Sequence, residues 1–225
     1  MKLTLTNRKT EGPEVESFIF KPPESLVWEA GQFLHYVLHH EPTDERGSDS
    51  WFTVASAPSE GVVMITTRFS NSTFKKALWE LQVGHAIEVS DVDGDFLLDS
   101  ADKKYVFIAG GIGITPFRAI LKEALHEGRP IDVTLLYASR DENITYKEEL
   151  ETIAKDNPNL KINYIISPER IDETKIRQLV PDIEKSFFYV SGPEPMTESL
   201  GNMLKAMGIP AERIKQDWFP GYPAE

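Results

Sequence analysis

From residue 105 onward, apolar runs typical of buried strands alternate with segments of helical spacing. Strands are expected at 105–109, 131–137, 162–166 and 187–190, and helices at 115–125, 146–154, 174–179 and 196–207. Such regular alternation with short connections fits few folds, because each helix must return the chain to the start of the next parallel strand. The second half is therefore predicted to form a parallel sheet with helices on both faces.

The first hundred residues follow a different pattern. Short runs rich in β-branched and aromatic residues are expected to form strands at 15–20, 33–38, 52–55, 62–68 and 86–89, with turn formers between them. One helix is expected to begin after Ser72 and Thr73, which are good N-cap residues. Many short strands and a single helix predict a small antiparallel β-barrel. We expect two domains, residues 1–101 and 102–225.

Composition restricts partners and chemistry. The 225 residues include 24 Lys and Arg but 36 Asp and Glu, a formal charge of −12, which argues against nucleic acids or anionic membranes as partners. Cysteine is absent, so thiolate nucleophiles, disulfides and cysteine-ligated metal clusters are excluded within this sequence. No run is long and apolar enough to span a bilayer, and no signal peptide is recognised, so a cytoplasmic protein is expected.

The segment Ala109-Gly110-Gly111-Ile112-Gly113-Ile114-Thr115-Pro116 lies where the first parallel strand should turn into its helix. Glycines there let a ligand approach the backbone closely, and Pro116 suits the first helical turn. The N–H groups and the dipole of a helix start favour a pyrophosphate. The spacing differs from G-x-G-x-x-G and lacks the lysine of a P-loop. A glycine turn required only for packing is the alternative interpretation.

Further short segments accompany this one in a fixed order: 51–58 (Trp-Phe-Thr-Val-Ala-Ser-Ala-Pro), 94–96, 110–116, 139–140, 191–193 with Met196, and 217–219. Together they resemble the ferredoxin–NADP reductase family of flavoenzymes over nearly the whole chain. The resemblance implies a ferredoxin reductase-like fold, in which a flavin-binding barrel precedes an NAD(P)-binding α/β domain. It implies hydride transfer between NAD(P)H and FAD, with FMN as the less favoured flavin. Ferredoxin, flavodoxin or a small molecule would accept the electrons.

The family's flavin motif, Arg-x-Tyr/Phe-Ser/Thr, falls on residues 50–53. The resemblance implies that Phe52 lies against the flavin and that the Thr53 hydroxyl lies near flavin N5. The other implied flavin-binding residues are Trp51, Val54, Ala55 and Ser56, with Ser72 and Thr73 at the helix start, where the family holds the flavin pyrophosphate. Ser50 replaces the family's phosphate-binding arginine. Arg68 and Lys75 are either its substitutes or ordinary surface charges.

In the second domain the resemblance assigns Gly110, Gly111, Gly113 and Pro116 to the nucleotide pyrophosphate. Thr115 would contact the nicotinamide. Ser191, Gly192 and Pro193 match the family's Cys-Gly-Pro beside it, with serine in place of the cysteine. The expected catalytic residues are therefore Thr53, Thr115 and Ser191.

The choice of nucleotide depends on the segment after the second parallel strand. Ser139 and Arg140 lie where the family reads the adenosine ribose, and Arg140 would favour the 2′-phosphate of NADPH. The acidic Asp141 and Glu142 favour NADH instead, so both nucleotides stay open.

Three aromatic residues near the end, Trp218, Phe219 and Tyr222, are candidates to stack on the flavin, Phe219 first, or to anchor a last strand. A basic patch for an acidic electron carrier could form from Lys75, Lys76, Lys103, Lys104 and Arg118. No metal site and no definite oligomeric state are predicted. Two alternatives remain, an electron-transfer subunit of a larger complex and a nucleotide-binding regulatory module without flavin catalysis.

Overall fold

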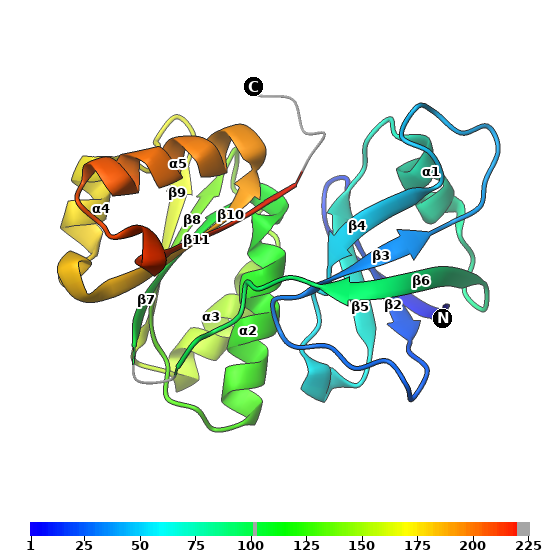
Figure 1. Cartoon of the computed structure of the whole chain (residues 1–225), viewed down its shortest axis with the longest axis horizontal. Coiled ribbons are helices and arrows are strands. Elements are labelled where there is room, and N and C mark those ends of the chain that lie inside the picture. Colours follow the sequence, from blue (N-terminus) through cyan, green and yellow to red (C-terminus); the bar gives the residue numbers. More distant parts are fainter. Residues whose placement is uncertain (101–102, 220–225) are drawn as a thin grey trace. The chain divides into compact units, whose positions relative to one another are not determined.

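The computed structural model describes residues 1–100 and 103–219, and the chain forms two compact units (Figure 1). Unit 1 comprises residues 1–97 and 118–126, and unit 2 comprises residues 98–117 and 127–225. The domain boundary expected from the sequence, between residues 101 and 102, lies outside the described residues.

Unit 1 is built on a six-stranded antiparallel sheet. Its strands are β1 (Lys2–Gly12), β2 (Val15–Lys21), β3 (Phe33–Val37), β4 (Asp49–Thr53), β5 (Val63–Arg68) and β6 (Ala86–Asp93), in the spatial order β4-β3-β6-β1-β2-β5. Every neighbouring pair is antiparallel. The antiparallel barrel predicted for the first half is thus confirmed, in the form of a curled sheet. The sequence patterns missed β1, because only Leu3 and Leu5 among its 11 residues are buried.

One face of this sheet forms the core of unit 1. Alternate residues such as Leu3, Leu5, Phe18 and Phe20 point into it, as the two-residue period of a strand requires. Helix α1 (Thr73–Glu80) covers part of the core, since Phe74 and Leu78 lie four residues apart on its buried side.

Unit 2 contains a five-stranded parallel sheet. Its strands are β7 (Lys104–Gly110), β8 (Asp132–Ser139), β9 (Leu160–Ile166), β10 (Ser186–Pro193) and β11 (Ile214–Phe219). Its helices are α3 (Lys147–Asp156), α4 (Glu173–Leu179) and α5 (Glu194–Ala206), together with the start of α2 (Thr115–His126), whose residues 118–126 belong to unit 1. Helices α4 and α5 pack on one face of the sheet, and α3 and the start of α2, where Phe117 stacks on Phe107, lie on the other (Figure 1). The predicted parallel sheet with helices on both faces is confirmed.

The strand order β11-β10-β7-β8-β9 places the first strand of this sheet, β7, at its centre. The chain adds β8 and β9 on one side of β7 and then crosses over to add β10 and β11 on the other. Loops that follow β7 and β10 therefore leave the sheet in opposite directions, the topology that places ligand sites of open α/β sheets at the carboxyl ends of such strands. Among the described residues no helix combines the length and the apolar character that a membrane crossing requires.

Candidate functional site

The glycine segment links the end of β7 to the start of α2. Gly110 is the last residue of β7, Gly111–Ile114 forms a 3₁₀ turn, and Thr115 begins α2. A Cβ atom on Gly113 would lie 2.2 Å from the carbonyl oxygen of Ser191, so only glycine lets the turn approach the end of β10 this closely. Gly111 has a φ of +51° and open space around its Cβ direction. The turn is thus packed on one side and open on the other.

The end of β10 completes this corner of unit 2. Ser191 pairs in register with Ala109 of β7 and with Asp217 of β11. It is fully buried, and its hydroxyl donates to Asp217 Oδ2 over 3.3 Å. Gly192 and Pro193 follow, and α5 begins at Glu194. The structure therefore brings the predicted residues 110–116 and 191–193 together at the switch point of the sheet.

Thr115 is buried, and its hydroxyl donates to the carbonyl oxygen of Ile112 over 3.2 Å. The side chain thereby fixes the 3₁₀ turn that precedes α2. The first turn of α2, which includes Pro116, contains no acidic residue, so its positive dipole end is not opposed by a carboxylate of its own. This is the charge distribution that favours a bound phosphate. The catalytic role of Thr115 stays a prediction.

The loop after β8 lies at the same edge of the sheet. The Ser139 hydroxyl donates to the Asp141 carbonyl over 2.8 Å, and the Asp141 carboxylate accepts the backbone N–H of Asn143 over 2.8 Å. Arg140 between them is exposed. Sequence reasoning missed Tyr137, whose hydroxyl donates to the Gly111 carbonyl over 3.0 Å and so ties β8 to the glycine turn. A tyrosine at the end of an otherwise apolar strand was the available signal.

In unit 1 the predicted flavin segment is strand β4. Trp51 is about half exposed and stacks on His35 with ring centroids 4.5 Å apart. Phe52 is partly buried and lies 5.7 Å from the ring of Phe74 in α1. Thr53 is buried at the end of the strand. Phe52 and Thr53 thus point to opposite faces of the sheet.

The residues that follow β4 are held by the fold itself. The N–H of Val54 donates to the Gln32 carbonyl over 3.0 Å, and that of Ala55 donates to the Met64 carbonyl over 2.8 Å. The Ser56 hydroxyl donates to the Val62 carbonyl over 2.6 Å and accepts the Met64 N–H over 3.0 Å. Any cofactor contact of Ser56 must therefore compete with these bonds.

An ion pair between the buried Arg118 and the half-buried Glu60 supports the same loop, and the sequence did not reveal it. Arg118 donates to the Ala55 carbonyl over 2.8 Å and to both carboxylate oxygens of Glu60 over 2.8 and 3.0 Å. Burial raises the pKa of Glu60, but the hydrogen bonds and charge of Arg118 outweigh it, with help from the Ala57 N–H and Lys122. The pKa of Glu60 therefore lies below its ordinary value.

At the start of α1, the Ser72 hydroxyl accepts the N–H of Lys75 over 3.1 Å, and Thr73 donates its N–H to Asp44 over 3.0 Å. The Lys75 ammonium is buried and donates to the carbonyl of Arg68 over 3.1 Å. The Arg68 guanidinium makes a long hydrogen bond of 3.4 Å to the carbonyl of Pro13. The two predicted substitutes for the missing arginine thus both donate to backbone oxygens.

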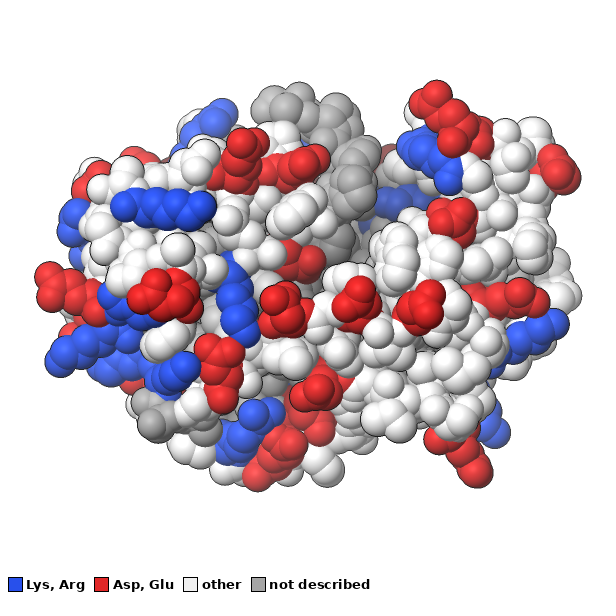
Figure 2. Space-filling view, viewed as in Figure 1, with Lys and Arg blue, Asp and Glu red and all other residues white. Residues whose placement is uncertain are grey.

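The expected basic patch does not form. Lys75 and Arg118 are buried, Lys103 pairs with Asp99 over 3.2 Å, and Lys104 pairs with Asp182. Burial and pairing occupy four of the five side chains that the sequence placed on the surface, and Lys76 is exposed. On the face shown in Figure 2, Lys and Arg side chains gather over unit 2, with acidic side chains among them.

Of the three terminal aromatic residues, Trp218 is about half exposed on β11. The backbone of Phe219 pairs in register with Pro193, and its side chain lies outside the described part of the structure. Tyr222 also lies outside it.

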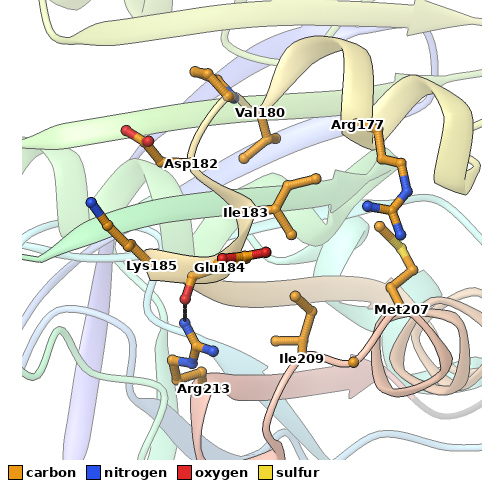
Figure 3. Close-up of a pocket in the computed structure, with 11 residues that line it drawn as sticks. Arg177, Val180, Asp182, Ile183, Glu184, Lys185, Met207, Ile209 and Arg213 are labelled. Atoms are coloured by element: carbon orange, nitrogen blue, oxygen red, sulfur yellow. Dashed lines mark hydrogen bonds between the residues drawn. The ribbon is translucent and has the colours of Figure 1, made fainter.

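A cavity of about 720 Å³ lies elsewhere in unit 2 (Figure 3). Its lining comes from the end of α4, the segment 180–185, residues 207–209 and Arg213, which donates to the Glu184 carbonyl. These segments precede β10 and β11, so the cavity opens at the edge where the strands start. The predicted nucleotide-binding residues of unit 2 lie at the opposite edge, where the strands end, and no predicted site residue lines this cavity.

The segment that contains the corner at β7 and β10 is similar to a known domain. Residues 107–201 match the model of the oxidoreductase NAD-binding domain. A flavohemoprotein of Burkholderia sp. is 26% identical over 93% of this chain and 56% of its own length. The ferredoxin reductase component of 3-ketosteroid-9-alpha-monooxygenase from Rhodococcus rhodochrous is 26% identical, over 96% of this chain and 64% of its own length. The flavohem-like FAD/NAD-binding domain of nitric oxide dioxygenase from Vibrio cholerae superimposes with a TM-score of 0.85 at 21% identity, covering 97% of this chain and 98% of that one.

The chain is similar in sequence to ferredoxin reductase-like FAD/NAD-binding oxidoreductases and shares their fold. This confirms the family resemblance, and proteins of this kind bind FAD and NAD(P)H as the sequence led us to expect. The chain spans less than two thirds of the length of the curated relatives described above. Activities of those whole proteins therefore do not transfer directly to it.

Proposed function

We propose that this chain transfers hydride between NAD(P)H and bound FAD and passes the electrons to a separate acceptor. One observation carries the proposal: residues 110–116 and 191–193 meet at the switch point of the sheet, inside the segment that matches an oxidoreductase NAD-binding domain. Ligands of open α/β sheets bind in this position.

The residues of unit 2 fit a dinucleotide. The 3₁₀ turn at Gly111–Ile114 and the acid-free start of α2 offer backbone N–H groups and a positive dipole end to the pyrophosphate. Gly111 has room for a phosphate, because no atom lies within 4 Å of its Cβ direction. Thr115 and Ser191, both buried beside the turn, hold it in place and would limit water at the nicotinamide.

The residues of unit 1 fit the flavin ring better than the flavin phosphates. Phe52 and Trp51 supply aromatic surface, and Thr53 supplies a hydroxyl that no described side chain engages. When bound, FAD would accept hydride and release electrons singly or in pairs. Thr53 would orient the ring, and Phe52 would pack against it. Ser50 supplies no positive charge for a phosphate.

Arg140 supports NADPH as the preferred nucleotide, because an exposed guanidinium after the second parallel strand suits a 2′-phosphate. Arg140→Gln should weaken NADPH binding about tenfold and leave NADH nearly unchanged. Lys161→Gln is the matched control, since this exposed cation lies at the start of β9, the opposite edge of the sheet. Equal affinities for NADPH in the wild type and Arg140→Gln would contradict the assignment.

The acceptor is proposed as a redox protein or a small molecule. One relative is by name the ferredoxin reductase component of a monooxygenase, and the relatives are longer than this chain. Both facts also support the alternative of an electron-transfer subunit in a larger complex. The net charge of −12 disfavours acidic carriers at long range. Cytoplasm is the proposed compartment, in keeping with the absence of cysteine.

An anaerobic visible spectrum tests the function directly. The purified chain is supplied with FAD and then with limiting NADPH or NADH, and bleaching of the flavin absorbance is followed. Bleaching faster than that of free FAD under the same conditions is the expected result. A chain that binds NAD(P)H but never bleaches FAD would favour the alternative of a regulatory nucleotide-binding module. That alternative is motivated by Ser50, which stands where the family has its phosphate-binding arginine.

A pair of glycine variants locates the nucleotide site. Gly111 and Gly128 both have positive φ, +51° and +64°, with open space where a Cβ would point. Replacing either by alanine should therefore cost a similar folding strain of about 1 kcal/mol. Gly111→Ala should in addition weaken NAD(P)H binding roughly tenfold, measured by calorimetry without flavin, because its methyl group enters the phosphate space. Equal affinities in the two variants would argue against the site.

A further inference from the structure

The start of α1 already holds a carboxylate from the chain itself. Asp44 Oδ2 accepts the Thr73 N–H over 3.0 Å, and the Asp44 N–H donates to the Thr73 hydroxyl over 3.1 Å. The hydrogen bond from Arg46 and the Thr73 N–H hold the pKa of Asp44 well below its usual range. Asp44 is therefore ionised at neutral pH and neutralises the positive end of the helix.

Three of the four cations around this helix start, Arg46, Lys75 and Arg68, are hydrogen-bonded as well. Arg46 donates two hydrogen bonds to the Asp44 carboxylate, from Nε over 3.2 Å and from Nη2 over 2.7 Å. Lys75 is buried and donates to the Arg68 carbonyl, and Arg68 donates to Pro13. Lys76 alone among the α1 cations is exposed, at the fourth residue of the helix. A phosphate that bound here would have to displace the Asp44 carboxylate from Arg46 and from the Thr73 N–H.

The face of β3 and β4 that carries Ser50 is aromatic, uncharged and largely buried in the core of unit 1. Ser50 lies opposite Tyr36 in the ladder, so their side chains share one face of the sheet. Tyr36 is fully buried, and its hydroxyl has no hydrogen-bond partner among the described residues. Phe52 follows on the same face and packs near Phe74. The aromatic groups of β4 that a flat ring could reach are the partly buried Phe52 and the exposed Trp51, and Ser50 between the core and the strand edge offers no guanidinium to a phosphate.

We propose that the chain recognises flavin by its ring system and not by its phosphates, so that riboflavin, FMN and FAD bind with similar affinity. The inference rests on the proposed function, since it assumes that unit 1 binds flavin. A flavin phosphate that displaced Asp44 would exchange one anion for another at the same N–H and gain little. Asp44 thereby acts as a specificity-determining residue: it removes the advantage that the phosphorylated flavins would otherwise have.

Calorimetric titration of the full chain with the three flavins, without NAD(P)H, tests this as binding and not as activity. The three dissociation constants should lie within about threefold of one another. Asp44→Asn should strengthen FMN and FAD binding by about fivefold or more and leave riboflavin unchanged, because it frees Arg46 and removes the competing charge. Glu45→Gln is the matched control, since it makes the same chemical change at the exposed neighbouring residue.

A second variant covers the case in which Asp44→Asn does not fold. Ser50→Arg places a guanidinium on the aromatic face and should also strengthen FMN and FAD binding selectively, with an affinity that falls as salt is raised. An FAD affinity more than about 30-fold above that of riboflavin in the wild type would overturn the inference and leave the proposed function standing. If none of the three flavins binds, the proposed function itself fails, and this inference fails with it.

Discussion

Helices α1 and α2 begin in opposite electrostatic settings. The start of α1 is closed by the chain's own groups, because Ser72 accepts the Lys75 N–H and Asp44 accepts the Thr73 N–H. The start of α2 follows a glycine turn, has no acidic residue in its first turn, and carries Arg118 as its fourth residue. The positive end of α1 is neutralised by a carboxylate of the chain itself, whereas the first turn of α2 contains no carboxylate.

This difference shows that a helix start becomes an anion site only where the fold does not fill it. In α1 the filling residue, Asp44, comes from a loop 29 residues earlier. In α2 the turn at Gly111–Ile114 occupies the place where a capping side chain would otherwise stand. We therefore expect phosphate recognition to reside mainly in unit 2, and substitutions at the two helix starts to have different consequences.

The first of the two largest effects is expected at Arg118, the cation near the start of α2. Arg118→Ala removes the partner of the half-buried Glu60 and leaves the Ala55 carbonyl without its donor. The free energy of unfolding should fall by about 2 kcal/mol, because the half-buried Glu60 loses its closest charge partner and keeps only Lys122, at 3.3 Å, and the Ala57 N–H. Urea denaturation measures it. Arg170→Ala is the control, because this arginine is exposed, and it should change the free energy of unfolding by less than about 0.5 kcal/mol. Arg129→Ala would not serve, because the Nε of Arg129 is buried.

The same pair predicts a pH dependence. The pKa of Glu60 in the folded chain lies below its ordinary value of 4.5, so the carboxylate stabilises the fold above that pH. This contribution should be lost as the pH falls through the lowered folded-state pKa. Glu60→Gln should be less stable than the wild type at pH 7, and its stability should fall less steeply between pH 4.5 and the acid transition. Parallel pH profiles for the two proteins would contradict this account.

The glycine turn before α2 offers a sharper test of close packing. A Cβ on Gly113 would meet the backbone oxygen of Ser191 at 2.2 Å, whereas a Cβ on Gly110 would meet the flexible Met196 side chain at 2.4 Å. Gly113→Ala should therefore cost about 2 kcal/mol and weaken NAD(P)H binding, because the backbone must move. Gly110→Ala should cost less, and Met196→Ala should relieve part of that cost. A Gly110 variant as unstable as the Gly113 variant would show that Met196 cannot move aside.

The features that the sequence predicted are those that local spacing determines. Parallel strands place their carboxyl ends at one edge of a sheet, so the glycine segment after β7 and residues 191–193 after β10 had to converge. The fold of both units followed from the period of apolar residues. Strand β1 was missed because its outer half carries polar residues on both faces and gives no strand period.

The features that the sequence missed depend on pairs far apart in the chain. Arg118 and Glu60 are 58 residues apart, and Asp44 and Thr73 are 29 residues apart. No spacing rule connects such residues, and the usual expectation that Arg and Lys are exposed placed Arg118 and Lys75 in a surface patch. Their burial could be recognised only once the sheet and α2 were in place. Tyr137, which bonds to the glycine turn, escaped notice for the same reason.

The smallest effect is expected at the cap of α1. Ser72→Ala removes the acceptor for the Lys75 N–H and should lower the free energy of unfolding by about 1 kcal/mol. Ser59→Ala is the control, since this exposed side chain caps no helix N–H, and it should have almost no effect.

Ser72→Asp then distinguishes the two helix starts. It keeps a capping oxygen and adds a negative charge, which normally stabilises a helix start. With Asp44 already bound to the Thr73 N–H, the second carboxylate should bring no gain, because the two like charges repel. In an Asp44→Asn background the same change should stabilise the chain. Thermal unfolding of the four proteins in this double-mutant cycle measures the coupling, and additive effects would mean that Asp44 does not neutralise this helix end.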